Sequence, residues 1–180
     1  MKKALLAISI GLAAGLAGTS ALANTGQINF EGMITSSTCQ IDVINPGDGS
    51  PGNLVKMVGV DASRFTAIGQ EYGGKIFDLR VHGGSGCALD PGNPNVATVT
   101  FSGRPDSSDT YFAVSEAEGV AIALRDANNK LLAPGSESDE YSINADRPTD
   151  LRFYATYRSI AAAVTPGAAS ADIQFSVAVN

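Results

Sequence analysis

The sequence predicts an all-β protein, an antiparallel β-sandwich that its own chain does not close. Two alternating apolar strips support this, Gly26-Gln-Ile28-Asn-Phe30-Glu-Gly32-Met-Ile34 near the start and Ile173-Gln-Phe175-Ser-Val177-Ala-Val179 at the end. Apolar side chains at every second position line one face of a pleated strand. We expect the second strip to end the chain inside a strand, which leaves its free edge without a later partner.

Residues 1–23 have the three parts of a secretory signal peptide. Lys2 and Lys3 form a basic start, residues 4–18 are apolar, and Ala21-Leu22-Ala23 is a small-x-small cleavage site. A membrane anchor is the alternative, but the apolar stretch is short and the cleavage triplet follows it directly. We therefore expect an exported mature chain with an N-terminal extension over residues 24–36 and one domain over residues 37–180.

The charge of the chain argues against a nucleic-acid partner. Removing Lys2 and Lys3 lowers the formal net charge from −6 to −8. An acidic chain with scattered Lys and Arg lacks the basic surface that binds phosphates. We expect no nucleic acid among its partners.

Cys39 and Cys87 are the only cysteines in the chain. Export places them in an oxidising compartment, where a disulfide is favoured over two buried free thiols. Closing the long span between them contributes roughly 4 kcal/mol of stability in the chain-entropy model. The sequence thus predicts a Cys39–Cys87 disulfide.

Short strips with alternating apolar residues recur through the body of the chain. Most of them are predicted to be strands with one buried face and one solvent-exposed face. Residues 45–53, 90–95 and 133–135 interrupt the strips, because Pro lacks an N–H donor and Gly favours turns. Many short strands separated by turns are typical of an antiparallel sandwich. The strips are Phe77, Leu79 and Val81; Ala97, Val99 and Phe101; Val120, Ile122 and Leu124; and Leu151, Phe153, Ala155 and Tyr157.

Residues that carry catalysis are scarce. His82 is the only histidine and Ser85 lies near it, but Gly83-Gly84-Ser85-Gly86 is not a nucleophile elbow. A lone His on the wet side of a strand is usually a surface residue. We expect no enzyme activity.

No metal or other cofactor is expected either. A zinc-type site needs clustered Cys, His or carboxylate ligands. Asp126-Ala-Asn128-Asn129 resembles a calcium loop but lacks the bidentate Glu, so we expect a turn between two strands. The acidic residues at 137–140 are expected to form a solvated loop.

The first strip has two possible destinations. It could fold back and complete its own sandwich, or it could complete another molecule. Only residues 35–38 separate Ile34 from Cys39, so this link reaches at most about 17 Å. Because so short a link makes folding back awkward, we expect the strip to act in trans.

The ordered motifs of the chain resemble the chaperone-usher pilins, which are type 1-like fimbrial structural subunits. The first strip followed by Cys39-Gln-Ile-Asp42 is similar to the family's extension and first cysteine. Further blocks follow in family order and cover the whole mature chain: Met57-Val-Gly59-Val60, Phe77-Asp-Leu79, Val99-Thr-Phe101-Ser-Gly103, Gly119 to Asp126, Leu151 to Tyr157, and Gly167 to Asn180.

The resemblance implies an incomplete immunoglobulin-like β-sandwich that lacks its final strand and is completed in trans by a donor strand. It implies three partners: neighbouring pilin subunits, a periplasmic chaperone that lends a strand, and an outer-membrane usher. The implied donor-strand residues are Gly26, Ile28, Phe30, Gly32 and Ile34, and the implied acceptor groove edge is Gly167, Ile173, Phe175, Val177 and Val179. The family usually has an aromatic residue next to last, where this chain has Val179.

We hypothesise that the chain is a structural subunit of a surface fimbria that supports cell adhesion, exported through the periplasm and polymerised by donor-strand exchange. The alternative is a self-contained, secreted carbohydrate-binding sandwich. Such sites usually display exposed aromatic side chains, whereas this chain has no Trp and many of its Tyr and Phe fit strand faces. A two-domain tip adhesin is not expected, because the first strip begins almost at the mature N-terminus.

Overall fold

The computed structural model describes residues 39–45, 49–83, 87, 89 and 94–179, all within one compact unit, Ile34–Asn180. These residues form almost only β-strands, and the helical element among them is the short 3-10 helix η1, Ala62–Arg64. In this described part, no helix is long and apolar enough to cross a bilayer. The prediction of an all-β antiparallel body is confirmed.

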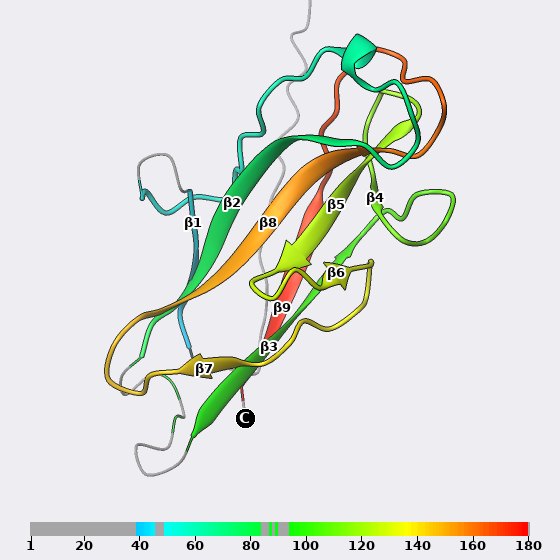
Figure 1. The fold of residues 1–180 in the computed structure, drawn as a ribbon. Helices are drawn as coiled ribbons and strands as arrows, with labels where there is room; N and C mark the ends of the chain where they lie inside the picture. The colour runs from blue at the N-terminus through cyan, green and yellow to red at the C-terminus, as the bar shows by residue number, and fades with distance from the viewer. Residues whose placement is uncertain (1–38, 46–48, 84–86, 88, 90–93, 180) are drawn as a thin grey trace, which may run out of the picture. The chain divides into compact units, whose positions relative to one another are not determined.

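The strands form two antiparallel sheets (Figure 1). Sheet A has the order β1-β2-β8-β5-β4, with β6 paired to β5, and sheet B has the order β7-β3-β9. Sheet A contains β1 (Ile41–Ile44), β2 (Glu71–Val81), β4 (Phe112–Ala113), β5 (Val120–Asp126), β6 (Leu131–Leu132) and β8 (Thr149–Ser159). Sheet B contains β3 (Asn95–Gly103), β7 (Tyr141–Ile143) and β9 (Ile173–Val179).

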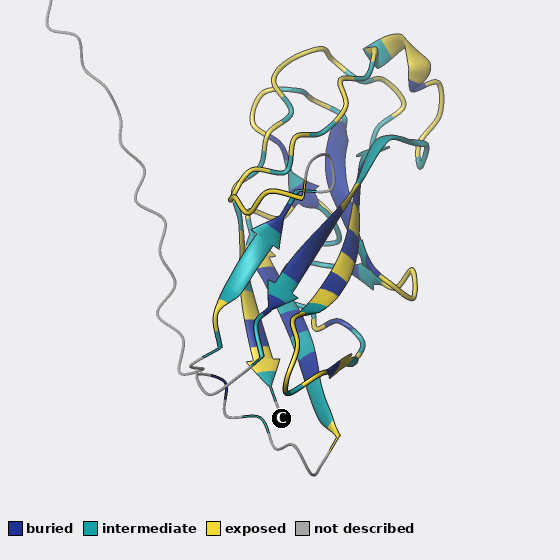
Figure 2. Cartoon of the chain, turned by 90° about the vertical axis from the view of Figure 1, so that its left-hand side faces the viewer, coloured by how far each residue is buried: buried dark blue, intermediate teal, exposed yellow. Residues whose placement is uncertain are grey.

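The core lies where the apolar strips of the two sheets meet. Val99 on β3 and both Leu151 and Phe153 on β8 are fully buried, and Phe101 is only 3% exposed. The centroid of the Phe153 ring lies 4.9 Å from that of Phe101 and 5.7 Å from that of Phe77. Figure 2 shows the resulting alternation of buried and exposed bands along the strands. Burial of these rings is a major part of the hydrophobic stabilisation.

Ion pairs cross the outer face of sheet A. Arg80 Nε donates to Asp150 Oδ1 at 2.6 Å, and Arg152 Nε donates to Asp78 Oδ1 at 3.0 Å. The alternation along β2 predicts that Asp78 is exposed to solvent. This residue is only 8% exposed, because the Arg152 guanidinium lies against it. Both pairs join residues that are opposite one another on β2 and β8.

Strand β5 departs from the predicted alternation because both of its faces are buried. Ala121 and Ala123, which alternate with the apolar strip, are fully buried. Their partners on β8 are the larger residues Arg158 and Thr156. The small alanine side chains are therefore recessed beneath longer neighbours.

The predicted turn after β5 is confirmed, and a carboxylate organises it. Asp126 Oδ1 accepts hydrogen bonds from the main-chain N–H groups of Asn128 at 3.0 Å and Lys130 at 2.9 Å. Asp126 Oδ2 accepts from the N–H of Asp139 at 3.0 Å. The Asp126 carboxylate thus fixes the β5–β6 turn.

The acidic segment 137–140 is a loop whose Glu137 and Glu140 are exposed, as predicted, but Ser138 within it is buried. Ser138 is only 5% exposed, and it exchanges two hydrogen bonds with Val99 of β3. An isolated bridge also joins Glu137 to Thr100. The carboxylates are therefore solvated, whereas the main chain of the loop is bound to sheet B at Ser138.

Candidate functional site: an open edge between the two sheets

Strand β9 carries the predicted acceptor residues and forms an edge of sheet B. Within the described part of the chain it pairs only with β3, in a register that opposes Val177 to Val99 and Phe175 to Phe101. Ile173, Phe175, Val177 and Val179 share the face that packs against the core. Val177 is buried, whereas the other three are only half-buried (Figure 2). The apolar face of β9 is therefore incompletely covered.

Residues 53–60, which we call the edge segment, follow β1 and precede η1. Val55, Met57 and Val60 are half-buried against the core, whereas Leu54 and Val58 are 70% and 56% exposed. Between Leu54 and Val60, no main-chain hydrogen bond to another described residue is formed. The edge segment thus has the side-chain pattern of a strand but no strand partner in the described structure.

A glycine on β2 lets the edge segment pass close to sheet A. Gly73 has a φ of +70°, and the pairing of β2 with β8 shifts register between Tyr72 and Lys75. A Cβ atom at Gly73 would lie 2.8 Å from the carbonyl oxygen of Val58 and 2.7 Å from Cγ2 of Val60. Only glycine fits this close approach.

A hollow of about 260 Å³ lies between the edge segment and the residues that precede β9. No charged side chain lines it. The hydroxyl of Tyr157 donates to the carbonyl of Ala169 at 2.9 Å, and burial raises the pKa of Tyr157. The hollow is therefore suited to an apolar side chain. Its walls include Val60, Phe65, Val120, Tyr157, Val164 and Ala169.

Gly167 also lines this hollow, ahead of β9 instead of within it. A Cβ atom at Gly167 would lie 2.9 Å from the main-chain nitrogen of Ala117. The neighbouring Ala168 carbonyl accepts hydrogen bonds from the N–H groups of Glu116 and Ala117 at 2.9 and 3.0 Å. Gly167 is needed because two main-chain segments approach closely at one wall of the hollow.

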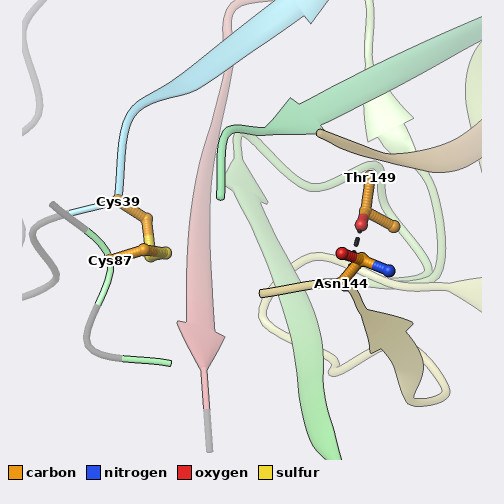
Figure 3. Close-up of a disulfide and its surroundings, with 4 residues drawn as sticks. All are labelled: Cys39, Cys87, Asn144 and Thr149. Atoms are coloured by element: carbon orange, nitrogen blue, oxygen red, sulfur yellow. Dashed lines mark hydrogen bonds between the residues drawn. A yellow bond between two sulfur atoms is a disulfide. The ribbon is translucent and has the colours of Figure 1, made fainter. Parts of the chain in front are cut away.

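The predicted disulfide between Cys39 and Cys87 is present (Figure 3). It joins the short segment before β1 to the connection between β2 and β3. Figure 3 also shows the Oγ1 of Thr149 accepting a hydrogen bond from the N–H of Asn144, at 3.0 Å. The disulfide ties the start of the described chain to the β2–β3 connection.

Two sequence predictions concern residues outside the described part of the chain. The donor-strand residues Gly26, Ile28, Phe30, Gly32 and Ile34 all lie there, and so does Ser85. His82 is described, and its Nε2 lies 2.9 Å from Asp42 Oδ2 on the neighbouring strand β1. Among the described residues, no group of three or more His, Cys, Asp and Glu is placed to hold a metal ion.

The charged groups near the body's core hold strands together and lie away from the hollow. Burial by itself raises the pKa of Glu71, but hydrogen bonds from Arg125, Arg158 and Thr156 outweigh it and hold this pKa below its usual range. The Arg125 and Arg158 nitrogens lie 2.8 and 2.6 Å from Glu71 Oε1. This network joins β2, β5 and β8 on the outer face of sheet A.

The residues predicted as the acceptor edge lie in strand β9, except Gly167, and sequence reasoning did not single out the edge segment. The signal was present, because Asn53-Leu-Val-Lys-Met-Val-Gly-Val60 is an almost continuous apolar run. Such runs are typical of strands that are covered on both faces. Among the described residues, β9 and the edge segment each combine half-buried apolar side chains with main chain that lacks a strand partner on one edge or along its length, and the hollow lies between the edge segment and the residues that precede β9.

Comparison with known proteins identifies the chain's relatives. The family model described as fimbrial protein matches residues 28–180. A fimbrial subunit type 1 from Salmonella typhimurium is 30% identical, over 83% of this chain and 80% of the relative. A Burkholderia pseudomallei antigen and type I fimbria protein has a similar structure, with a TM-score of 0.58, 26% identity, and coverage of 78% of this chain and 99% of that one.

The P pilus rod subunit PapA shares the fold, with a TM-score of 0.63 and 20% identity, over 80% of this chain and all of that one. The matched residues of the family model span much more than half of the sequence. The chain therefore belongs to the fimbrial protein family and has the incomplete immunoglobulin-like β-sandwich fold.

Proposed function

We propose that this fimbrial subunit polymerises by donor-strand exchange, in which the extension over residues 24–36 fills the groove of the next subunit. The observation that carries the proposal is the pair of open borders, β9 and the edge segment, with half-buried apolar side chains between them. An inserted strand would form main-chain hydrogen bonds with both borders, and its alternate side chains would enter the groove.

The donor side chains suit such a groove. Ile28, Phe30 and Ile34 alternate with polar or small residues. Burying these three large apolar side chains would contribute roughly 4.5 to 9 kcal/mol. Phe175 and Met57 would gain the cover that they lack in the described body.

The direction of the donor strand follows from where the ends of the body lie. Strand β9 begins near the hollow and ends where Val179 pairs with Ala97, at the same end of the body as Cys39 (Figure 3). A donor strand that runs antiparallel to β9 would end with Ile34 near the hollow. The body of the donor subunit would then lie beyond the hollow end of the acceptor. A parallel donor would place two disulfide-bearing ends together and leave no route for a continuous fibre.

The remaining partners follow from the same groove. A periplasmic chaperone would lend a strand to the exported subunit, and an outer-membrane usher would let the extension of the next subunit replace it. The fibre would reach the cell surface and support adhesion. The family assignment favours this fibre over a self-contained carbohydrate-binding sandwich.

Removing residues 24–36 and returning them as a peptide tests the proposal. The trimmed body should have a low melting temperature that the peptide raises. In a matched control peptide, Ser replaces Ile28 and Phe30, and this peptide should have no effect. A trimmed body that is already fully stable, with no rise on adding the peptide, would contradict donor-strand exchange.

A cellular measurement tests the chaperone. The exported subunit should be degraded in the periplasm unless a chaperone of this system is co-expressed, because its groove exposes apolar surface. Equal subunit levels with and without the chaperone would remove the chaperone from the proposal.

A further inference from the structure

The two borders, β9 and the edge segment, carry a single charge between them. Lys56 is the only charged residue in the ranges 53–60 and 173–179. It is exposed and lies between Val55 and Met57, which are half-buried against the core. Its ammonium group takes part in none of the ion pairs or hydrogen bonds formed among the described residues. An unpaired cation therefore lies in the middle of the edge segment, on the face turned away from the core.

The N-terminal extension also has a single charged side chain. Glu31 is the only acidic residue in the range 24–36, which contains no Lys, Arg or His. The apolar strip places Phe30 and Ile34 on one face of a strand, so the alternation predicts that Glu31 lies on the other face. In a strand inserted between the two borders, this other face is the solvent side, where Lys56 lies. The two side chains therefore have opposite charges and would share one face.

The direction of the donor strand determines which residues meet. The edge segment runs toward the hollow, because Gly59 and Val60 line it. A donor that runs antiparallel to β9 also ends near the hollow, so it would lie parallel to the edge segment. Neighbouring strands advance by almost the same rise per residue. Placing Ile34 beside Gly59 would therefore place Glu31 beside Lys56.

The sizes of the inward side chains favour the same register. In this register, Gly32 would lie between two large side chains, Met57 of the edge segment and Phe175 of β9. Phe30 would lie beside the smaller Val55. A shift of the donor by two residues would instead bring Phe30 between Met57 and Phe175. Three large side chains at one level are crowded, and overpacking of this kind is destabilising.

We propose that Lys56 of the acceptor subunit binds Glu31 of the inserted extension and so sets the register of the donor strand. The proposal rests on donor-strand exchange with a donor antiparallel to β9, and the donor is a second copy of this chain. Neighbouring strands lie about 4.8 Å apart, so the two long side chains can reach one another. An extension with a neutral or basic side chain at this position would lose the pair.

The other charged groups around the two borders support this register. The exposed carboxylates at the hollow end of the body are Asp61, Glu116, Glu118 and Asp172, with the Arg64 guanidinium stacked on Tyr72. A donor shifted toward that end would bring Glu31 closer to an excess of like charge. Glu137 is bound to Thr98 of β3, and β9 separates it from the donor position. Lys75, two residues beyond Gly73 on β2, is half-buried and adds positive charge next to the edge segment.

Carbodiimide cross-linking of the full mature chain tests the contact. The reagent activates a carboxylate, and a nearby amine then displaces the activating group to form an amide bond. Oligomers are assembled from isotopically labelled and unlabelled chains, and strand donation is verified by slowed amide exchange in β9. Mass spectrometry should find Glu31 of one chain joined to Lys56 of the other. The cross-link should be absent in Lys56→Gln. A strand-donated oligomer without this cross-link, or with Glu31 joined to Lys75, would overturn the pair.

A charge swap tests what the pair contributes to assembly. Lys56→Glu and Glu31→Lys should each lower the fraction of strand-donated oligomer by about two- to fivefold at low salt, as expected for loss of an exposed ion pair. The double variant should assemble like the wild type. The single variants change the net charge in opposite directions, so a general effect of charge would not impair both. Added salt should reduce both losses.

The outcomes separate the ion pair from strand donation. Equal fractions of strand-donated oligomer for all four proteins would overturn the pair and leave donor-strand exchange intact. A double variant that assembles no better than the single variants would also overturn it, because the two charges would then act independently. A wild-type chain in which exchange of the β9 amides is never slowed would overturn both proposals.

Discussion

Strands β3 and β9 are neighbours in sheet B and present the same kind of apolar face to sheet A, yet they are buried to different extents. Val99 and Phe101 on β3 are 0% and 3% exposed, whereas Phe175 and Ile173 on β9 are half-buried. The difference lies in what stands beside each strand. β3 has a partner strand on both edges, and β9 has one on a single edge within the described structure.

This difference shows that alternation alone does not determine burial. An apolar face is covered only when the strand is flanked by neighbours and lies opposite a second layer. Under the proposal of donor-strand exchange, the incompletely covered face at β9 is the binding site for a strand from another chain.

The largest expected contrast is between two phenylalanines. Phe153→Ala should destabilise the trimmed body by about 3 to 5 kcal/mol, because Phe153 is fully buried among aromatic rings. Phe175→Ala should lower the free energy of unfolding of the same body by clearly less. It should, however, weaken binding of the 24–36 peptide by tenfold or more, because about 1.5 to 3 kcal/mol of apolar burial is lost. Urea unfolding and peptide titration measure the two effects. Equal losses of unfolding free energy for the two variants would mean that the apolar face of β9 is already buried in the trimmed body.

A second contrast tests whether the edge segment is a border of the groove. Met57→Ser should weaken peptide binding by roughly tenfold or more, by loss of about 1.5 to 3 kcal/mol of apolar burial. Leu54→Ser is the matched control, because Leu54 lies on the opposite face and is 70% exposed. Calorimetric titration of both variants should show a loss only for Met57. Similar affinities would place the donor strand elsewhere.

A third contrast concerns the wall of the hollow. Gly167→Ala should destabilise the body by about 1 to 3 kcal/mol, because the new Cβ meets main chain that cannot easily move. Gly52→Ala is the control, since nothing lies within 4 Å of its added Cβ. Thermal unfolding compares the two. A Gly167→Ala protein as stable as the wild type would show that the loops at 115–119 and 160–168 are not packed as described.

The smallest expected effect is a difference in pH dependence. The lowered pKa values of Glu71 and Asp106 mean that both carboxylates are more acidic when folded than when unfolded. Their stabilisation is present above the ordinary carboxyl pKa, about 4, and is lost as the pH falls through the folded values. The hollow has no carboxylate in its lining.

The stability of the body should therefore fall below about pH 4, while affinity for an N-acetylated peptide stays constant from about pH 5 to 8. Acid unfolding and peptide titration across this range check both statements. Glu71→Gln should give a shallower acid slope. A strong pH dependence of peptide affinity would place a titrating group in the groove.

The long strands could be predicted from the sequence because their alternation spans several residues. The strips at Phe77, Val99, Ile122, Phe153 and Phe175 all lie in strands. The short strands β4, β6 and β7 were missed because two or three residues cannot show a period. The first part of β2 was missed because its Gly-Gly bulge interrupts the alternation.

The site could be predicted in part. The four residues of β9 follow from their alternation, and Gly167 from the family resemblance. The reason for Gly167 could not be predicted, because its close contact with Ala117 joins segments that are 50 residues apart. The role of Asp126 follows a recognisable pattern, since Asp two residues before Asn commonly begins a turn.

Amide hydrogen exchange tests the central claim most directly. In the trimmed body, the N–H groups on the free edge of β9 and those of the edge segment should exchange rapidly, while the amides of β3 exchange slowly. Adding the 24–36 peptide should slow exchange on both borders of the groove and leave β3 unchanged. Slow exchange on both borders before the peptide is added, or no change after it, would contradict the account.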